Sequence, residues 1–411
     1  MKERVIDAYA RLVVRMGVNL QKGQPVVINT PVECADFARR LARFAYEAGA
    51  RDVTMCWNDE KFARLRYELA PEEALGTFPD WRRRLYDDNA AADAAIISIH
   101  AEDPEAFRGI EPARLAMAQQ AAGTALKSYR ARIMRSQNAW CVVSVPTVGW
   151  ARRVFSGQTD AEAVESLWTA ILAAVRVTED DGAEARWEAH TDFLRRAADF
   201  MNGWAFSSLH YKNALGTDFV VRLPEGHLWA GGAELTTGGT RFVANLPTEE
   251  VFTLPMRDGA EGVVCATRPL VFQGNLIKDM RLTFRAGRVV DYAASEGRGH
   301  LEKLLETDEG SARLGEVALV PYDSPISRSG LLFYNTLFDE NASCHLALGK
   351  AYPTSLSGGA AMSQEELLAR GVNDSLLHED FMIGSRDLSI TGTTKDGREV
   401  PVFRDGNFVE F

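Results

Sequence analysis

Short apolar runs alternate with longer amphipathic stretches through the first half of the chain. The apolar runs 25–29, 52–57, 94–99 and 140–145 have the length and composition of buried strands. The stretches 2–19, 33–48 and 112–134 repeat apolar residues at helical spacing, and Gly49 follows the second of them as a helix stop. Buried strands that alternate with helices in this way predict βαβ units and a parallel sheet.

The pattern changes after two further helical stretches, 160–178 and 184–201. Short β-rich runs then follow, separated by glycine, asparagine and proline, at 220–223, 238–244, 262–266, 270–272, 280–284 and 288–292. The link 285–288 between the last two runs indicates a tight hairpin turn. Helical stretches at 300–307 and 363–369 are added to these strands. The second half therefore predicts a largely antiparallel sheet with added helices.

Asp180-Asp181-Gly182 lies between two helical stretches and marks the expected domain boundary. We expect an α/β amino-terminal domain with a parallel sheet at 1–182, which acts as a scaffold and oligomerisation domain. We expect an α+β carboxy-terminal domain with a largely antiparallel sheet at 183–411, which carries the candidate metal site described below. A chain of 411 residues is long enough for two such cores.

Composition narrows the classes of function. The formal net charge is −11, and no block of lysine and arginine compensates it, which argues against a nucleic-acid partner. No window of about 18 apolar residues occurs, so we expect no membrane span. The turns at 29–31 and 57–59 are not glycine-rich and do not predict a nucleotide site. The five cysteines are scattered without a CxxC pair, and the amino terminus lacks the apolar core of a secretion signal, so we expect a cytoplasmic protein.

Acidic residues and histidines occupy four distinctive contexts in the second half. Glu249 and Glu250 follow Pro247, which we expect to end a central strand. Glu316 lies inside the apolar run 314–320, where a buried carboxylate needs a cation or a donor as partner. The other two contexts, 339–352 and 378–380, contain the remaining candidates, Glu340, His345, Tyr352, His378 and Asp380. Carboxylates together with imidazoles form the ligand mixture that borderline divalent cations prefer.

Local geometry suggests how two of these segments could converge. If 342–352 is helical, His345 and Tyr352 lie on one face, two turns apart. If 378–382 is a strand, His378 and Asp380 point to one side and Glu379 to the other. The two segments could then direct four side chains into one cavity.

Each candidate also has a purely structural interpretation. Glu249 and Glu250 could form a solvated turn, and Glu316 could pair with Arg313. His345 could be a hydrogen-bonded core histidine, and His378 could lie on the surface after the turn 373–375. The metal-site hypothesis therefore depends on the combination of segments, since no single motif such as HExxH is present.

Four ordered blocks of the second half resemble those of the thermophilic metalloaminopeptidase family, and the resemblance runs nearly end to end. The blocks are Asn245-Leu246-Pro247-Thr248-Glu249-Glu250-Val251-Phe252, Leu314-Gly315-Glu316-Val317-Ala318, Phe338-Asp339-Glu340-Asn341-Ala342-Ser343-Cys344-His345 with Ala347, Gly349 and Tyr352, and His378-Glu379-Asp380-Phe381-Met382-Ile383-Gly384. The resemblance implies a dinuclear metal site with the ligands Glu250, Glu316, His345, His378 and Asp380, with Glu340 as a further ligand and Tyr352 as a catalytic tyrosine. It alone selects Glu250 over Glu249, and it also implies a homodimer.

These residues fit metal-dependent hydrolysis of the first bond in short peptides with a free amino terminus. Two divalent ions roughly 3.5–4 Å apart can share a carboxylate and a water molecule whose pKa is then lowered. We expect Glu316 or Asp380 to bridge the ions, and Glu316 and Tyr352 to be catalytic, with the Tyr352 hydroxyl stabilising the oxyanion. The amino group of the peptide is expected to contact the other ion or Glu249. Zn²⁺, Co²⁺, Mn²⁺ and Mg²⁺ all accept such ligands.

Two alternative functions stay open at this point. An iron-dependent ring-cleaving dioxygenase on the same scaffold needs two histidines and one carboxylate, which His345, His378 and Asp380 could supply. A non-catalytic metal-binding scaffold would use the acids only for structure. Metal stoichiometry and hydrolysis of amino-acyl anilides separate the three hypotheses.

Overall fold

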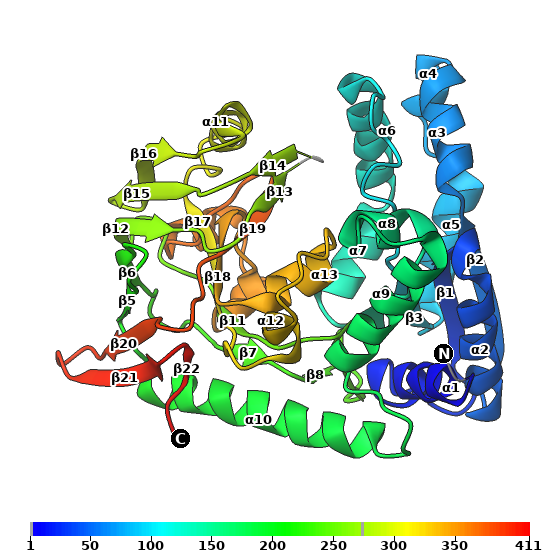
Figure 1. Ribbon diagram of the computed structural model, residues 1–411, viewed down its shortest axis with the longest axis horizontal. Coiled ribbons are helices and arrows are strands. Elements are labelled where there is room, and N and C mark those ends of the chain that lie inside the picture. Colours follow the sequence, from blue (N-terminus) through cyan, green and yellow to red (C-terminus); the bar gives the residue numbers. More distant parts are fainter. Residues whose placement is uncertain (1–2, 273–274) are drawn as a thin grey trace. The chain divides into compact units, whose positions relative to one another are not determined.

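The computed structural model describes residues 3–272 and 275–411 and divides the chain into two compact units (Figure 1). Unit 1 comprises Met1–Glu188, Ala233–Pro247 and Leu332–Leu337, and unit 2 comprises Ala189–Gly232, Thr248–Leu331 and Phe338–Phe411. The division falls inside the long helix α10 (Ala183–Trp204). The segments 233–247 and 332–337 thus cluster with unit 1, although they lie beyond position 182. The ranges 1–182 and 183–411 remain a prediction about domains.

A five-stranded parallel sheet in the order β10-β4-β3-β1-β2 forms the centre of unit 1. Val26, Val27 and Ile28 in β1 are all buried, as expected for a strand covered on both faces. This sheet confirms the predicted α/β amino-terminal part. Its strands are β1 (Pro25–Pro31), β2 (Asp52–Asn58), β3 (Ala95–Ile99), β4 (Trp140–Val143) and β10 (Asn245–Leu246).

Two expectations for the region before Pro247 are wrong. The run 238–244 does not form one strand, because β9 (Arg241–Phe242) pairs with β8 (Glu234–Leu235) in a small separate hairpin. Pro247 follows β10, which is a two-residue edge strand and not a central one. A proline is tolerated at an edge because no neighbouring strand needs its missing N–H.

The helices of unit 1 include three in the region 60–91 that the apolar pattern did not predict. The long helical pattern at 112–134 is divided into two helices at Leu126. The helices are α1 (Glu3–Leu12), α2 (Ala35–Glu47), α3 (Glu60–Leu69), α4 (Glu72–Leu75), α5 (Asp80–Ala91), α6 (Pro112–Ala125), α7 (Lys127–Met134), α8 (Val148–Val154) and α9 (Asp160–Ala174).

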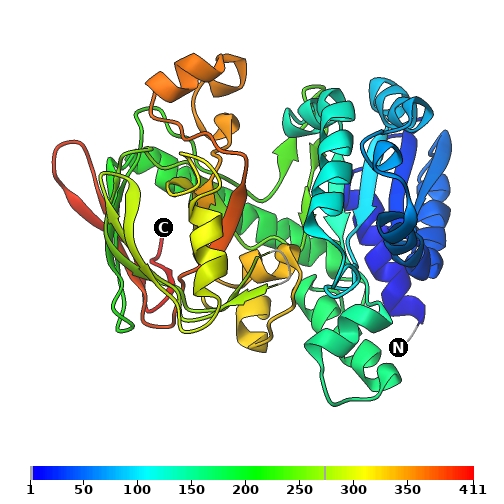
Figure 2. The same ribbon diagram turned by 90° about the horizontal axis from the view of Figure 1, so that it is seen from above.

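Unit 2 contains an eight-stranded antiparallel sheet in the order β16-β15-β12-β6-β5-β20-β21-β22, which is strongly curved (Figure 2). The predicted hairpin at 285–288 joins β15 to β16 and is confirmed. The strands are β5 (Ser208–Lys212), β6 (Asp218–Arg222), β12 (Ala260–Cys265), β15 (Arg281–Arg285), β16 (Arg288–Ala293), β20 (Ser389–Thr393), β21 (Glu399–Arg404) and β22 (Asn407–Phe408).

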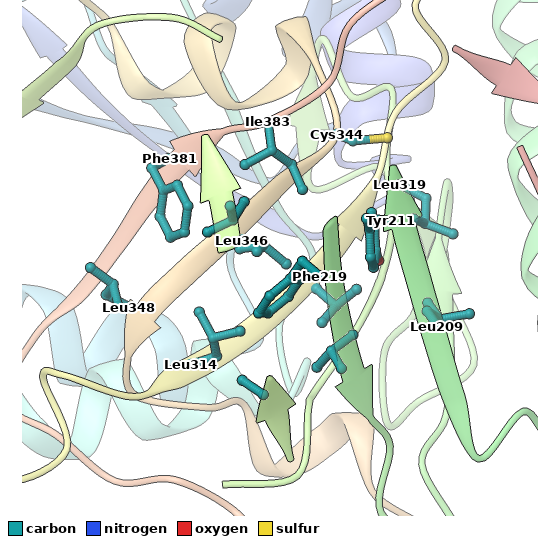
Figure 3. Packing of buried hydrophobic residues seen from close by; sticks show 14 of the residues in the cluster. Leu209, Tyr211, Phe219, Leu314, Leu319, Cys344, Leu346, Leu348, Phe381 and Ile383 are labelled. Carbon is teal, nitrogen blue, oxygen red and sulfur yellow. The ribbon is translucent and has the colours of Figure 1, made fainter. Parts of the chain in front are cut away.

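A second antiparallel sheet of unit 2, in the order β19-β18-β17-β11-β7, carries most of the candidate metal ligands. Its strands are β7 (Ala230–Gly231), β11 (Val251–Thr253), β17 (Leu314–Leu319), β18 (His345–Gly349) and β19 (His378–Met382). Both sheets share one hydrophobic core, in which Leu346 and Phe381 belong to the same cluster as Tyr211 and Phe219 (Figure 3). The antiparallel α+β carboxy-terminal part is therefore confirmed.

Shorter elements complete unit 2. They are the antiparallel pair of β13 (Leu270–Phe272) and β14 (Asn275–Ile277), and the helices α11 (Arg298–Leu305), α12 (Pro325–Ser329), α13 (Thr336–Asp339), which begins in unit 1, and α14 (Gln364–Ala369). Short 3₁₀ turns lie at Glu340–Ala342 and Pro353–Ser355. Among the described residues, no helix is both long enough and apolar enough to cross a bilayer.

Candidate metal centre

The five-stranded antiparallel sheet of unit 2 has one apolar face and one face with ionisable groups. Val317, Leu346 and Phe381 pair across neighbouring strands and lie in the core. Side chains alternate between the faces of a sheet, so the next row, Glu316, Ala347 and Asp380, lies on the opposite face. We call this opposite face the metal face.

A β-bulge at Gly315 is needed to direct Glu316 toward the metal face. Leu314 pairs with Leu348 and Glu316 with Ala347, so the register shifts at Gly315. Leu314 can therefore lie in the core although it is two residues from Glu316. A Cβ atom on Gly315 would lie only 2.3 Å from the backbone oxygen of Lys350, so glycine is required by this close approach.

Two groups of potential ligand atoms meet on the metal face. In group A, His345 Nε2 lies 3.2 Å from Glu250 Oε2 and 3.5 Å from Glu316 Oε1. In group B, His378 Nε2 lies 3.4 Å from Asp380 Oδ1 and 3.7 Å from Glu316 Oε2. The ligand atoms of each group all lie within 4.8 Å of one another. Glu316 belongs to both groups, and each of its oxygen atoms faces a different histidine.

Backbone carbonyl groups orient both histidines. The Nδ1 atom of His345 lies 3.1 Å from the Ser343 carbonyl oxygen, and Nδ1 of His378 lies 2.7 Å from that of Lys350. When Nδ1–H donates to these carbonyl groups, the Nε2 lone pair of each ring points toward the carboxylates. This is the usual arrangement of metal-binding histidines, in which the second ring nitrogen fixes the tautomer and the orientation of the ring.

The electrostatics of the two groups show an excess of negative charge. Burial disfavours protonation of His345, but Glu250 and Glu316 outweigh burial and raise its pKa well above the ordinary value. Burial likewise acts against protonation of His378, yet Asp380 and Glu316 raise its pKa to about 10. Burial, together with the charge of Asp380, raises the pKa of Glu316. Without a cation, protons are therefore held here to compensate the carboxylates.

Two buried oxygen atoms lack the hydrogen bond that a buried polar atom normally has. Glu250 Oε2 and Asp380 Oδ1 accept no hydrogen bond of good geometry from the described residues, although histidine Nε2 atoms lie 3.2 and 3.4 Å from them. Buried oxygens of this kind need an explanation, and an ion is one of the standard ones. The donor set of carboxylate and imidazole suits a divalent cation such as Zn²⁺, Mn²⁺ or Co²⁺. The residues therefore fit a metal.

Tyr352 and Glu340 lie beside the two groups. The Tyr352 ring centroid is 4.9 Å from that of His378. Burial, and then the charges of Glu316 and Asp380, raise the pKa of Tyr352 well above its ordinary value. Glu340 lies in the 3₁₀ turn Glu340–Ala342, and burial with the charges of Glu250 and Asp380 raises its pKa. It belongs to neither group of close ligand atoms.

Glu249 has a different environment from its neighbour Glu250. Its carboxylate Oε2 lies 3.5 Å from His190 Nε2, and its backbone N–H donates to Asn341 Oδ1 at 2.7 Å. His190 Nε2 also lies 2.8 Å from the Thr248 carbonyl oxygen. Glu249 is in neither group of ligand atoms. His190 and Asn341 therefore support the backbone from which Glu250 projects, and sequence patterns offered no signal for either of them.

One of the two local geometries expected for the site is wrong. His345 begins strand β18, so 342–352 is not helical, and His345 and Tyr352 do not share a helix face. The apolar run Leu346-Ala347-Leu348 is a strand buried between two neighbouring strands. The other expectation is correct, since His378 and Asp380 lie on one side of strand β19 and approach each other.

Comparisons with known proteins agree with this arrangement. The sequence profile of the family described as Thermophilic metalloprotease (M29) matches residues 2–408. Aminopeptidase 2 of Geobacillus stearothermophilus is 50% identical over 406 residues, which cover 99% of this chain and 98% of that protein. Aminopeptidase AmpS of Bacillus subtilis is 49% identical over 403 residues, which cover 98% of each. The solved structure of wild-type AmpT from Thermus thermophilus matches with a TM-score of 0.93 at 43% identity, over 99% of this chain and 100% of that chain.

A more distant structure bears on the alternative functions. A 2,5-dihydroxypyridine dioxygenase from Pseudomonas putida matches with a TM-score of 0.54 at 13% identity, over 99% of this chain and 97% of that chain. At this identity the likeness concerns the fold alone. Aminopeptidases at 49% and 50% identity do not favour a ring-cleaving dioxygenase or a non-catalytic scaffold. The resemblance to the thermophilic metalloaminopeptidases is confirmed, and the chain belongs to the Thermophilic metalloprotease (M29) family of hydrolytic enzymes.

Proposed function

We propose that this chain is an aminopeptidase that removes amino-terminal residues from short peptides, and that groups A and B each hold one divalent cation. The M29 profile and the aminopeptidase relatives support the reaction. The observation that carries the two-cation proposal is the position of Glu316, whose oxygen atoms face two different histidines. When bound, two such cations lower the pKa of a shared water molecule and polarise a carbonyl group.

Glu316 is the proposed bridging ligand. It is the one residue common to both groups, and it lies in the strand β17 at the centre of the sheet. Asp380 Oδ1 also approaches both histidines, at 3.4 Å from His378 Nε2 and 4.0 Å from His345 Nε2. It is therefore the second candidate for a bridge. Glu250 and His345 complete group A, His378 completes group B, and Glu340 is proposed as a further ligand.

Tyr352 is the proposed donor to the oxyanion that develops on the scissile carbonyl group. A donor fixed in a site of low dielectric stabilises such an oxyanion more than water does. The raised pKa of Tyr352 keeps its hydroxyl group protonated at neutral pH, so that it can donate. Its ring centroid lies 4.9 Å from that of His378, which supports a position of Tyr352 beside the metal face.

A carboxylate of the site that does not bind a cation favours a positively charged substrate group. The free amino terminus of a peptide carries this charge, whereas an acetylated terminus does not. Glu249 was expected to contact this group, but its carboxylate lies near His190. Glu340, which belongs to neither group of close ligand atoms, is the better candidate for this contact, as an alternative to its role as a further ligand.

The proposal also covers the location and the assembly of the protein. We propose a cytoplasmic homodimer that does not bind nucleic acid or membranes. The five buried cysteines without a disulfide suit a reducing compartment. The net charge of −11 disfavours a nucleic-acid partner. Light scattering that gives the mass of a monomer would contradict the dimer.

The test uses two matched substrates, an amino-acyl anilide and the same anilide with an acetylated amino group. The protein is freed of metal with a chelator and reconstituted separately with Zn²⁺, Co²⁺, Mn²⁺ or Mg²⁺, and bound metal is measured by elemental analysis. We expect hydrolysis of the free amine only, with two ions per chain at full activity. Equal hydrolysis of the acetylated substrate would refute an aminopeptidase, and full activity with one ion per chain would refute the two-cation mechanism.

A further inference from the structure

Arg268 is a cation of unit 2 without a close carboxylate partner. Its side chain is partly buried, and its Nη1 donates one hydrogen bond to the Leu331 carbonyl oxygen at 2.8 Å. No carboxylate oxygen of the described residues lies within 4.0 Å of its guanidinium group. Burial lowers its pKa, and the charge of Asp339 offsets this effect only in part. A guanidinium group has five N–H donors, so most of its capacity for hydrogen bonds is unused.

Two observations place Arg268 at one end of the metal face. The preceding residue, Thr267, donates its backbone N–H and its hydroxyl group to the Met382 carbonyl oxygen, at 2.8 and 3.3 Å. Met382 pairs with His345 in the ladder between β19 and β18. Arg268 thus follows a residue at the outer edge of β19, and the backbone of that residue, Thr267, lies about two strand spacings, or roughly 10 Å, from the backbone of His345.

The guanidinium group contacts the connection between β17 and β18, because Leu331, which accepts its hydrogen bond, lies in that connection together with Glu340. Asp339, the carboxylate whose charge acts on Arg268, directly precedes Glu340 in the chain. The residue after Glu340, Asn341, accepts a hydrogen bond from the backbone N–H of Glu249 at 2.7 Å, so this segment lies beside the one that carries Glu250. The connection between β17 and β18 therefore lies next to the carboxylates of the metal face and also contacts Arg268, a cation with unused hydrogen-bond donors.

We propose that Arg268 binds the terminal carboxylate of a short peptide whose amino terminus lies at the metal face. This inference rests on the proposed aminopeptidase function and specifies its substrate class. An extended peptide spans about 3.3 Å per residue, so roughly 10 Å corresponds to about three residues. Arginine binds carboxylates through two parallel hydrogen bonds, which a lysine cannot reproduce. The preferred substrates are accordingly peptides of two to four residues with a free carboxylate.

If Arg268 has only a structural role, its replacement is expected to change substrate preference differently. If the residue only supports the loop at Leu331, its replacement should affect all substrates to the same extent. If it binds the substrate carboxylate, replacement should remove the preference for a free carboxylate over an amide. The ratio of kcat/KM for the two forms of one peptide therefore separates these roles, since changes in folding or metal content cancel in it.

The experiment compares the metal-loaded wild type with Arg268→Met, Arg268→Lys and the control Arg257→Met. Arg257 is already paired with Glu309, so its replacement should leave the preference unchanged. The substrates are Leu-Gly-Gly, its carboxy-terminal amide and leucyl anilide. We expect the wild type to prefer the free acid by roughly ten- to a hundredfold, mainly through KM, as for hydrogen bonds to a charged group. The ratio should approach unity in Arg268→Met and be intermediate in Arg268→Lys.

Two outcomes would overturn the proposal, and neither bears on the proposed function. They are a wild type that hydrolyses acid and amide equally well, and variants of Arg268 that keep the wild-type ratio. If Arg268→Met does not fold, the ratio in Arg268→Lys decides the question, because that variant keeps the positive charge. If the metal-loaded wild type does not hydrolyse leucyl anilide or the peptides, the proposed aminopeptidase function itself fails.

Discussion

Replacing the shared carboxylate should empty both metal sites, whereas replacing an unshared one should empty only one. Glu316 contributes one oxygen to each group, so Glu316→Gln leaves Glu250 with His345 in group A and His378 with Asp380 in group B. Each site then has two strong protein ligands, fewer than the three that catalytic sites usually provide. Glu250→Gln removes a ligand from group A but leaves group B complete.

The magnitude follows from binding equilibria. Loss of a residue that merely supports a ligand costs about 10–100-fold in metal affinity, so loss of a ligand should cost at least about 100-fold. At a metal concentration about ten times the wild-type Kd, occupancy of each site is about 90%, and it falls to about 10% when Kd rises 100-fold. Each filled site adds about 1.4 kcal/mol of stability at this concentration. Glu316→Gln should thus lose about twice as much metal-dependent stability as Glu250→Gln.

The assay is elemental analysis after dialysis against buffer with a fixed free metal concentration, together with thermal unfolding with and without chelator. We expect close to two ions per chain for the wild type, about one for Glu250→Gln, and close to none for Glu316→Gln. Glu316→Gln should also abolish hydrolysis of leucyl anilide. If Glu316→Gln binds as much metal as Glu250→Gln, Glu316 does not serve both sites and the bridging role is refuted.

Three further predictions concern the same face. Tyr352→Phe should lower kcat by about 10²–10³-fold with unchanged metal content, and steady-state kinetics with a normal kcat would remove Tyr352 from the mechanism. Gly231→Ala should weaken metal binding, because its Cβ would lie 2.6 Å from the Glu250 backbone oxygen, whereas Gly299→Ala, in open space, should not. In the metal-free protein the pKa of His378 is raised from 6.5 to about 10. Its protonation therefore stabilises the fold fully below about pH 6.5, and this contribution is lost as the pH rises through 10. The melting temperature of the chelated wild type should fall over this range more than that of His378→Gln, and parallel curves would contradict this linkage.

Much of the fold could be predicted from the sequence because its signals are local. The parallel strands β1 to β4 are nearly continuous apolar runs, and each lies within one or two residues of its expected position. The hairpin between β15 and β16 likewise has its turn where glycine occurs. The helix expected at 342–352 is wrong because Leu346, Ala347 and Leu348 suit a buried helix and a buried strand equally well. Pairing with β17 and β19 determines the strand, and no pattern within the segment reports that pairing.

The direction of a candidate ligand likewise cannot be predicted from local sequence patterns alone. In a regular strand, Leu314, Glu316 and Ala318 would share one face, and the carboxylate would point into the core with Leu314. The bulge at Gly315 separates them, and the sequence signals it only by a glycine inside an apolar run. Which of several strand glycines forms a bulge depends on the neighbouring chain, here the backbone of Lys350.

The choice between Glu249 and Glu250 also depends on partners that are distant in the sequence. Val251 begins β11 and lies in the core, so the alternation of side chains directs Phe252 toward the metal face, and Glu250 shares that direction. Glu249 then points the other way, where its buried carboxylate lies 3.5 Å from His190 Nε2. His190 lies on α10, far away in the chain. The environments of Glu249 and Glu250 therefore differ because α10 packs beside them, and the sequence around the two acids does not report this packing. His190→Leu should therefore disturb Glu249 first and reduce metal binding only through the shift of Glu250, and metal titration that shows an unchanged Kd would exclude this coupling.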